Sequence, residues 1–156
     1  IPWLNYGINL AAYWKNFDLQ LFFQGVGGNK IYNQKRMQLE SNGSSSVLSP
    51  VMADVWTTDN PDGSLPNAVN SVNYYTSDRF LESGSYFRLK NLQLGYSLPR
   101  NLIGKAGFQN CRLYLQGGNL FTVTKYTGFD PEVSGGVDYG NYPQSRTFIF
   151  GINITY

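Results

Sequence analysis

A two-residue alternation of apolar and polar side chains is the feature of this sequence that most restricts its fold. From Phe148 to Tyr156 every even position is apolar, and most odd positions are polar or small. Successive side chains of a β-strand point to opposite faces of a sheet, so this pattern predicts a strand with one apolar face. The same period predicts four more strands, over residues 6–14, 17–24, 86–98 and 112–121, the last with a bulge near Gly117 and Gly118.

The composition excludes several classes of protein. Aromatic residues make up 16% of the chain and charged residues only 14%, whereas an average soluble domain carries about 25% charged residues. No apolar stretch approaches the roughly 18 residues that a membrane-spanning helix needs, so a helical membrane protein is excluded. The net charge of +2 is too small for the basic surface of a nucleic-acid-binding protein, and we expect no nucleic-acid partner.

Most catalytic and metal-binding chemistry is also excluded. The chain has no histidine and a single cysteine, Cys111. Zinc sites of His and Cys, Ser-His-Asp triads, Cys-His dyads and disulfide frameworks therefore cannot form within it. Asp130 and Glu132 are spaced like a glycosidase pair, but Pro131 between them fits a loop bend better. We predict no enzyme activity, no catalytic residue, no metal ligand and no cofactor.

The connections between the predicted strands alternate between short and long. Residues 15–16 and 99–110 are short connections, whereas residues 27–84 and 122–145 are long ones. Antiparallel strands of about ten residues, with short turns at one end and long loops at the other, are typical of bacterial outer-membrane β-barrels. The polar strand faces then line the lumen, and the apolar faces contact lipid.

This topology predicts where individual residues lie in the membrane. With the short turns at one rim, Trp14, Phe17, Tyr96 and Tyr156 are expected at nearly one height, as an aromatic girdle at the interface. Arg88 and Lys90 are expected in the apolar register near the opposite rim. There a cation costs about 0–1 kcal/mol, against about 2–4 kcal/mol at the midplane.

A soluble protein is the alternative interpretation of the same pattern. Alternation with period two does not distinguish an apolar face that meets lipid from one that meets a protein core. A soluble, aromatic-rich β-sheet module that binds glycans therefore remains open from periodicity alone. Five strands are too few to close a membrane barrel, since the smallest have eight, so the membrane interpretation requires a larger protein.

Six segments of the chain together span almost its whole length. They are GVGGNKIYN (25–33), SDRFLESGSYFRLKNL (77–92), LGYSLP (94–99), GNLF (118–121), GFDPE (128–132) and DYGNYP (138–143). These segments resemble the C-terminal part of SusC-like TonB-dependent transporters of Bacteroidota, in which they recur in the same order.

The resemblance implies a fold, a function and partners. It implies that residues 1–156 are an all-β, antiparallel transmembrane segment, about five strands of a 22-stranded barrel with two long extracellular loops. The whole protein would be an active importer of glycans or peptides in the outer membrane of a Gram-negative bacterium. It would be energised by TonB through an N-terminal part that this sequence lacks, and capped by a SusD-like surface lipoprotein.

Two sets of residues are candidate sites. The end of the last strand resembles the signal that the barrel assembly machinery reads, with Gly151, Ile154 and Tyr156. Aromatic faces beside amide groups in the long loops suit sugar rings or peptides. The alternative is that these aromatic side chains pack the loops against each other and against the lipoprotein partner. The candidates are Trp56, Tyr74, Tyr75, Tyr139 and Tyr142.

A helix is also expected within the first long loop, over residues 32–40. Lys35, Arg36 and Glu40 are expected to form its solvated face.

Overall fold

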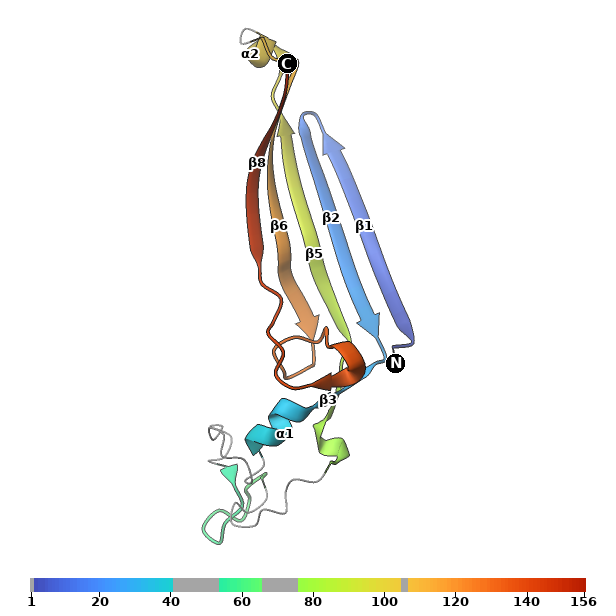
Figure 1. Ribbon diagram of the computed structural model, residues 1–156, viewed down its shortest axis with the longest axis vertical. Coiled ribbons are helices and arrows are strands. Elements are labelled where there is room, and N and C mark those ends of the chain that lie inside the picture. The colour runs from blue at the N-terminus through green and yellow to red at the C-terminus, as the bar shows by residue number, and fades with distance from the viewer. Residues whose placement is uncertain (1, 41–53, 66–75, 105–106) are drawn as a thin grey trace. The chain divides into compact units, whose positions relative to one another are not determined.

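Five strands form one antiparallel sheet in the computed structural model, in the order β1-β2-β5-β6-β8 (Figure 1). All five predicted strands are confirmed, and with them the all-β antiparallel fold class. Each strand pairs with its predecessor in the sheet through a long antiparallel register. Their bounds are β1 (Leu4–Trp14), β2 (Phe17–Gly27), β5 (Tyr86–Ser97), β6 (Asn110–Thr124) and β8 (Thr147–Thr155).

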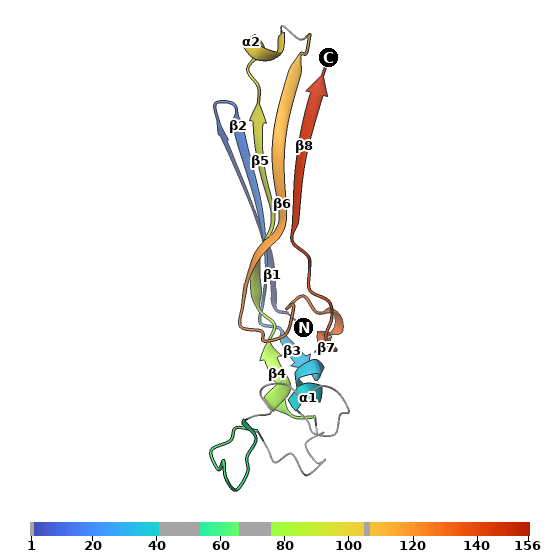
Figure 2. The same ribbon diagram turned by 90° about the vertical axis from the view of Figure 1, so that its left-hand side faces the viewer.

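The structure describes residues 2–40, 54–65, 76–104 and 107–156, which divide into two units. The first unit is the five-stranded sheet with its short connections, one of which carries α2 (Arg100–Ile103). Viewed from the β8 side, α2 and the C-terminus lie at the same end of this sheet (Figure 2).

We call the second unit the loop module. It comprises residues 29–84 and 125–142 of the two long connections. A three-stranded sheet of order β4-β3-β7 forms its centre. None of the helices among the described residues is long and apolar enough to cross a membrane. The elements of the loop module are β3 (Lys30–Asn33), α1 (Gln34–Glu40), η3 (Asp78–Phe80), β4 (Leu81–Ser83), η5 (Ser134–Gly136) and β7 (Val137–Asp138).

The cross-strand register places apolar residues on one face of the five-stranded sheet and polar residues on the other. Directly paired residues share a face. One such row is Leu19, Leu94, Leu115 and Phe150. The neighbouring row on the opposite face is Gln20, Gln93, Gln116 and Ile149. Three residues of the apolar row are exposed, Leu94 by 42%, Leu115 by 47% and Phe150 by 67%, so the described part of the chain leaves this face largely uncovered.

Aromatic rings gather on the apolar face toward both ends of the strands. Near the β1–β2 turn, the Phe17 ring lies 4.6 Å from Tyr96 and 6.4 Å from Trp14, measured between ring centroids. Toward the other end, the Phe23 ring lies 5.2 Å from Phe87, which also stacks with Tyr6 at 6.3 Å. Rings at both ends of an apolar band are what a sheet crossing a bilayer presents.

The predicted girdle residues do not all share one row of the sheet. Trp14 is paired with Phe17 and Phe17 with Tyr96, and that row continues through Leu113 to Ile152 on β8. Tyr156 stands four positions beyond Ile152 in the sequence. Barrel strands tilt by roughly 40°, which staggers residues of equal height from strand to strand. A common height for all four therefore stays a prediction.

A bulge at Lys90 reverses the alternation along β5. Phe22 pairs with Asn91, but its neighbour Phe23 pairs with Leu89, so Lys90 is an extra residue on β5. Residues before the bulge therefore have the opposite parity from those after it, and Leu89 joins Leu92 on the apolar face.

The prediction for Arg88 is wrong because of this bulge. Arg88 lies on the polar face, opposite Gln24 and Thr122, and is only 2% exposed. Its Nε donates a hydrogen bond of 2.8 Å to Thr122 Oγ1, and its guanidinium lies 5.4 Å from the centroid of the Tyr86 ring. The bulge thus keeps a cation off the apolar face.

β6 contains a second irregularity close to the predicted one. Gly118 pairs with Asn91 and Phe121 with Leu89, so Asn119 and Leu120 span the gap. Asn119 has a φ of 52°, in the left-handed region. The bulge therefore follows Gly117 and Gly118 directly.

An ion pair crosses the middle strand on the polar face, over a glycine. Arg112 on β6 donates from Nε to Asp18 Oδ1 at 2.9 Å and from Nη2 to Asp18 Oδ2 at 2.5 Å. Asp18 lies on β2, and Gly95 on β5 stands between them. A Cβ atom at Gly95 would lie 2.4 Å from both Arg112 Nη2 and Asp18 Oδ1. Only glycine leaves room for this bridge.

We expect Gly95→Ala to lower the free energy of unfolding of the full-length protein by about 1 kcal/mol, because the added methyl group displaces a partly exposed bidentate ion pair. Urea unfolding of the protein folded in detergent measures this. Gly27→Ala is the matched control, since its Cβ would meet only Leu4 side-chain atoms, at 3.6 Å or more. If Gly95→Ala costs as much in an Asp18→Ala background as in the wild type, the ion pair is not the reason.

Candidate functional site

Asn33 connects three segments of the loop module. Its Oδ1 accepts a hydrogen bond of 2.9 Å from the Arg36 backbone N–H, which caps the start of α1. Its Nδ2 donates to Glu82 Oε1 at 3.2 Å and to Thr127 Oγ1 at 3.4 Å. Asn33 is only 2% exposed. One buried amide therefore joins α1, β4 and the segment that follows β6.

Glu82 is the acceptor on which this network converges. Besides Asn33, its carboxylate accepts hydrogen bonds from the Thr127 backbone N–H at 2.8 Å, from Thr127 Oγ1 at 2.7 Å and from Arg36 Nη1 at 3.1 Å. Burial alone would raise the pKa of Glu82, but the bonds from Thr127, Arg36 and Asn33 together outweigh it. The pKa of Glu82 therefore lies below its ordinary value, and the group is a carboxylate at neutral pH.

Arg36 and Glu40 belong to a partly buried ion network, so the prediction that they form a solvated face is wrong. Arg36 Nε donates to Glu40 Oε1 at 2.6 Å, one helical turn away. Arg79 Nη2 lies 3.3 Å from Glu40 Oε2. The side chain of Glu40 is 8% exposed and that of Arg36 is 33% exposed. Two arginines and the carboxylates of Glu40 and Glu82 compensate one another here.

A second buried carboxylate, Asp138, organises the end of the other long connection. Tyr126 donates its hydroxyl to Asp138 Oδ2 at 2.6 Å, and the backbone N–H groups of Gly140 and Asn141 donate to Oδ1 at 2.8 and 3.0 Å. Burial, together with the bond to Asp138, raises the pKa of Tyr126 above its ordinary value. Burial would raise the pKa of Asp138, but its three hydrogen bonds outweigh burial and lower it. The pair is a neutral phenol bound to a carboxylate.

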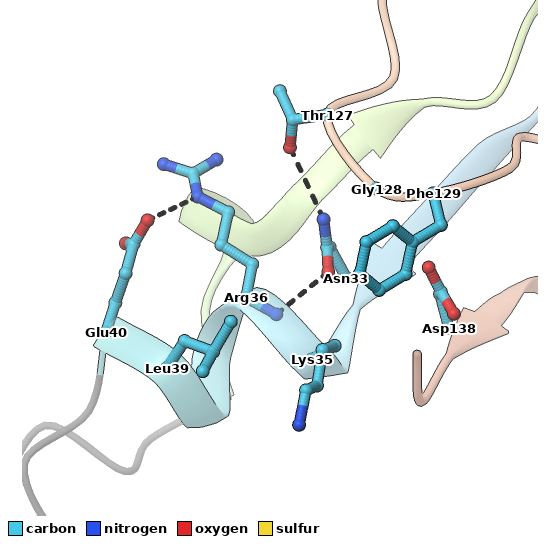
Figure 3. Close-up of a pocket in the computed structure, with 9 residues that line it drawn as sticks. All are labelled: Asn33, Lys35, Arg36, Leu39, Glu40, Thr127, Gly128, Phe129 and Asp138. Atoms are coloured by element: carbon cyan, nitrogen blue, oxygen red, sulfur yellow. Dashed lines mark hydrogen bonds and ion pairs between the residues drawn. The ribbon is translucent and has the colours of Figure 1, made fainter. Parts of the chain in front are cut away.

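These two networks form part of the wall of a pocket of about 510 Å³ within the loop module (Figure 3). α1 supplies one side, and the chain after Thr127 supplies the apolar ring of Phe129. Figure 3 also shows Arg36 and Lys35 leaving α1 in opposite directions. The volume of the pocket is within the range of small-molecule sites, about 300–1,000 Å³. The lining residues are Asn33, Lys35, Arg36, Leu39, Glu40, Thr127, Gly128, Phe129 and Asp138.

The three predicted contact residues that the structure describes lie outside the lining of this pocket. Trp56, Tyr139 and Tyr142 are exposed, by 43%, 67% and 93% respectively. Trp56 belongs to a turn closed by the Val55–Leu65 bridge, whereas Tyr139 and Tyr142 follow β7. Tyr74 and Tyr75 lie outside the described residues. The role of all five in contacting a substrate or a partner stays a prediction.

Gly151 and Ile154 of the predicted assembly signal lie on β8, an edge strand of the five-stranded sheet, and Tyr156 directly follows that strand. Ile154 is paired with Cys111 on β6 and is 51% exposed, and Tyr156 is 91% exposed. Gly151 is paired with Tyr114, and a Cβ at Gly151 would lie 2.2 Å from Cζ of that ring. The glycine therefore has a local packing role, because the Tyr114 ring covers it.

The sequence predicted Lys35, Arg36 and Glu40 only as a solvated helix face, and no other residue that lines the pocket was predicted as a site. Asn33 directly precedes α1, which is the usual signal for an N-cap, but the helix was predicted to begin at residue 32. Glu82, Gly128 and Asp138 lie in the segments that resemble the transporter family. A Cβ at Gly128 would lie 2.4 Å from the Tyr126 ring, so this position needs glycine for close packing.

The chain is similar to receptors of known families over nearly its whole length. It is 38% identical to TonB-dependent receptor P3 of Formosa agariphila over 167 aligned positions, which cover 99% of this chain and 16% of that receptor. It is 27% identical to TonB-dependent receptor SusC of Bacteroides thetaiotaomicron, over 96% of this chain and 15% of SusC. No protein-family profile matches the sequence.

Solved structures agree with this similarity. The chain superposes on part of the RagAB peptide importer in its closed-closed state with a TM-score of 0.89 and 35% sequence identity. That match covers 99% of this chain and 17% of the importer chain. The chain thus spans less than a fifth of the length of the relatives that it matches.

Proposed function

This chain belongs to the SusC-like TonB-dependent receptors, and on that premise we propose that it forms C-terminal barrel strands of an active importer in the outer membrane. The whole protein imports glycans or peptides, is energised by TonB and works with a SusD-like surface lipoprotein. The likeness to a peptide importer and to SusC supports this class of activity.

The exposed apolar face of the five-stranded sheet is the observation that carries the proposal. Leu94, Leu115 and Phe150 stand in one exposed row, and aromatic rings lie on the same face toward both strand ends. Covering such a face with lipid stabilises it by about 25 cal/mol for each Å² removed from water. A soluble glycan-binding module would instead bury this face in its own core.

The activity itself is tested by growth. A strain that lacks the gene should fail to grow on one member of a panel of oligosaccharides and oligopeptides offered as sole carbon source. The full-length gene should restore growth only in cells that also contain TonB. Restoration without TonB would contradict an energised importer.

A topology experiment tests the placement in the membrane. In a full-length receptor with Cys111→Ser, we expect a membrane-impermeant maleimide to label Asp62→Cys on intact cells and to leave Asn16→Cys unlabelled. Asp62 lies in the long connection, whereas Asn16 lies in the short β1–β2 turn. Both positions should be labelled after the cells are lysed. Labelling of Asn16→Cys alone on intact cells would mean that the short turns, and not the long loops, face the outside of the cell.

A further inference from the structure

Nearly every polar side chain that lines the loop-module pocket already has its hydrogen bonds within the module. Both amide atoms of Asn33 and the hydroxyl of Thr127 are bonded. The guanidinium of Arg36 is paired with the carboxylates of Glu40 and Glu82, and Glu40 is also paired with Arg79. These groups form the wall and are not available as the main contacts of a ligand.

Lys35 is the exception among the charged groups of this lining. Among the described residues its ammonium group has no hydrogen-bond or ion-pair partner. The aliphatic stem of Lys35 packs against Gly140, where a Cβ would lie 3.2 Å from Lys35 Cγ and 3.3 Å from Cδ. Gly140 also has a φ of 91°, which favours glycine. The lysine is thus packed along its stem, and none of the described residues pairs with its charged end.

The remaining surface of the pocket is apolar. Leu39 lies one turn after Lys35 on α1, and Phe129, 69% exposed, lies on the chain after β6. Asp138 also lines the pocket, but it is 2% exposed and both of its oxygens accept hydrogen bonds. Within the described residues, an unpaired cation beside a half-buried leucine and an exposed phenylalanine complements a ligand with one negative charge and an apolar body.

We propose that this pocket binds a small organic carboxylate with an apolar body, and that the C-terminal residue of a peptide is the form in which the receptor meets it. The apolar side chain lies against Leu39 and Phe129, and the carboxylate pairs with the Lys35 ammonium. This inference rests on the proposed import function, because it names the class of solute that the loop module receives. An uncharged oligosaccharide has no group that needs Lys35.

Binding to the purified full-length receptor in detergent tests the inference by calorimetry. The probes are N-acetyl-leucyl-phenylalanine and its C-terminal amide, which differ only in the charge of the terminus. We expect the acid to bind about tenfold more tightly than the amide at low salt, because a charge-assisted bond is lost in the amide. Lys35→Met, which keeps the stem but removes the charge, should bind both probes equally, and Lys35→Arg should retain the preference. Lys30→Met is the control, because Lys30 is exposed on β3 and does not line the pocket.

Three results would overturn the inference: equal affinity of the wild type for acid and amide, no binding of either probe, or an unchanged preference in Lys35→Met. None of these bears on import itself, because TonB-dependent growth of the wild-type strain is measured separately. Loss of that growth dependence would instead contradict the proposed function, whatever the pocket binds.

Discussion

Replacing Leu94 with arginine should lower the free energy of unfolding of the assembled receptor by about 2–4 kcal/mol, because a cation is then held against lipid near the middle of the bilayer. Leu94 belongs to the row that runs between the two aromatic clusters of the apolar face. Urea unfolding of the full-length receptor in liposomes measures the loss, with the heat-modifiable shift in electrophoretic mobility as the readout of the folded barrel.

Gln93→Arg is the control for this substitution and should cost much less, because the same charge then enters the polar face. Gln93 is paired with Gln20 and Gln116, which are uncharged. Asn153 is a poorer control, since it is paired with Arg112 and a second arginine there would add repulsion. Equal losses for Leu94→Arg and Gln93→Arg would contradict the assignment of the two faces.

Lipid contact distinguishes a membrane sheet from a soluble one, since both tolerate arginine better on a polar face. A photo-crosslinking residue at position 94 or 152 should capture acyl chains in the native membrane, whereas one at position 93 or 153 should not. Capture at 93 and 153 alone would mean that the register is reversed on both strands.

Glu82→Ala is expected to destabilise the loop module by about 2–3 kcal/mol, because Arg36 Nη1 and the Thr127 N–H lose their acceptor and Asn33 Nδ2 loses one of its two acceptors. The figure is below that for a fully buried pair because Arg36 is one third exposed and water can partly replace the carboxylate. Hydrogen exchange of the Thr127 amide in the full-length receptor reports this loss, since that N–H is bonded to Glu82. Asp62→Ala, which removes an exposed carboxylate from the same module, should leave the exchange unchanged.

The contribution of Glu82 should also depend on pH in a defined direction. The pKa of Glu82 is lower in the folded protein than its ordinary value of 4.5. Its stabilisation is therefore fully present above pH 4.5 and is lost as the pH falls through the lower, folded value. Protection of the Thr127 amide, corrected for intrinsic exchange, should stay constant from pH 7 to 5 and decline below 4.5 in the wild type. A decline that begins near neutral pH would implicate a different group.

The sequence alone was sufficient to predict the five strands of the sheet, because the alternation of side chains along a strand is a local property. Successive Cβ atoms of an extended chain point to opposite sides whatever the strand pairs with, so residues 147–156 show their apolar face without knowledge of β6. The β1–β2 hairpin was predictable for the same reason, since its strands are joined by two residues and pair with each other. Aromatic residues at the ends of these runs indicated a membrane interface before any pairing was known.

The sequence did not determine which face Arg88 occupies or which residues make the pocket. Lys90 becomes a bulge only because β5 must match the register of β2, and a single extra residue there moves Arg88 from the apolar to the polar face. Asn33, Glu82 and Thr127 are up to 94 positions apart, and their hydrogen bonds exist only where β3, β4 and the segment that contains Thr127 are brought together in the loop module. Arg36 and Glu40 look like a solvated helix face because the pattern of α1 is local, whereas their burial depends on Arg79 and Glu82 from a distant segment. The alternation of side chains along a strand follows from the local backbone and can be predicted from the sequence. The partners of a side chain are decided by tertiary contacts, because the segments that meet are distant in the sequence and neither one indicates the other.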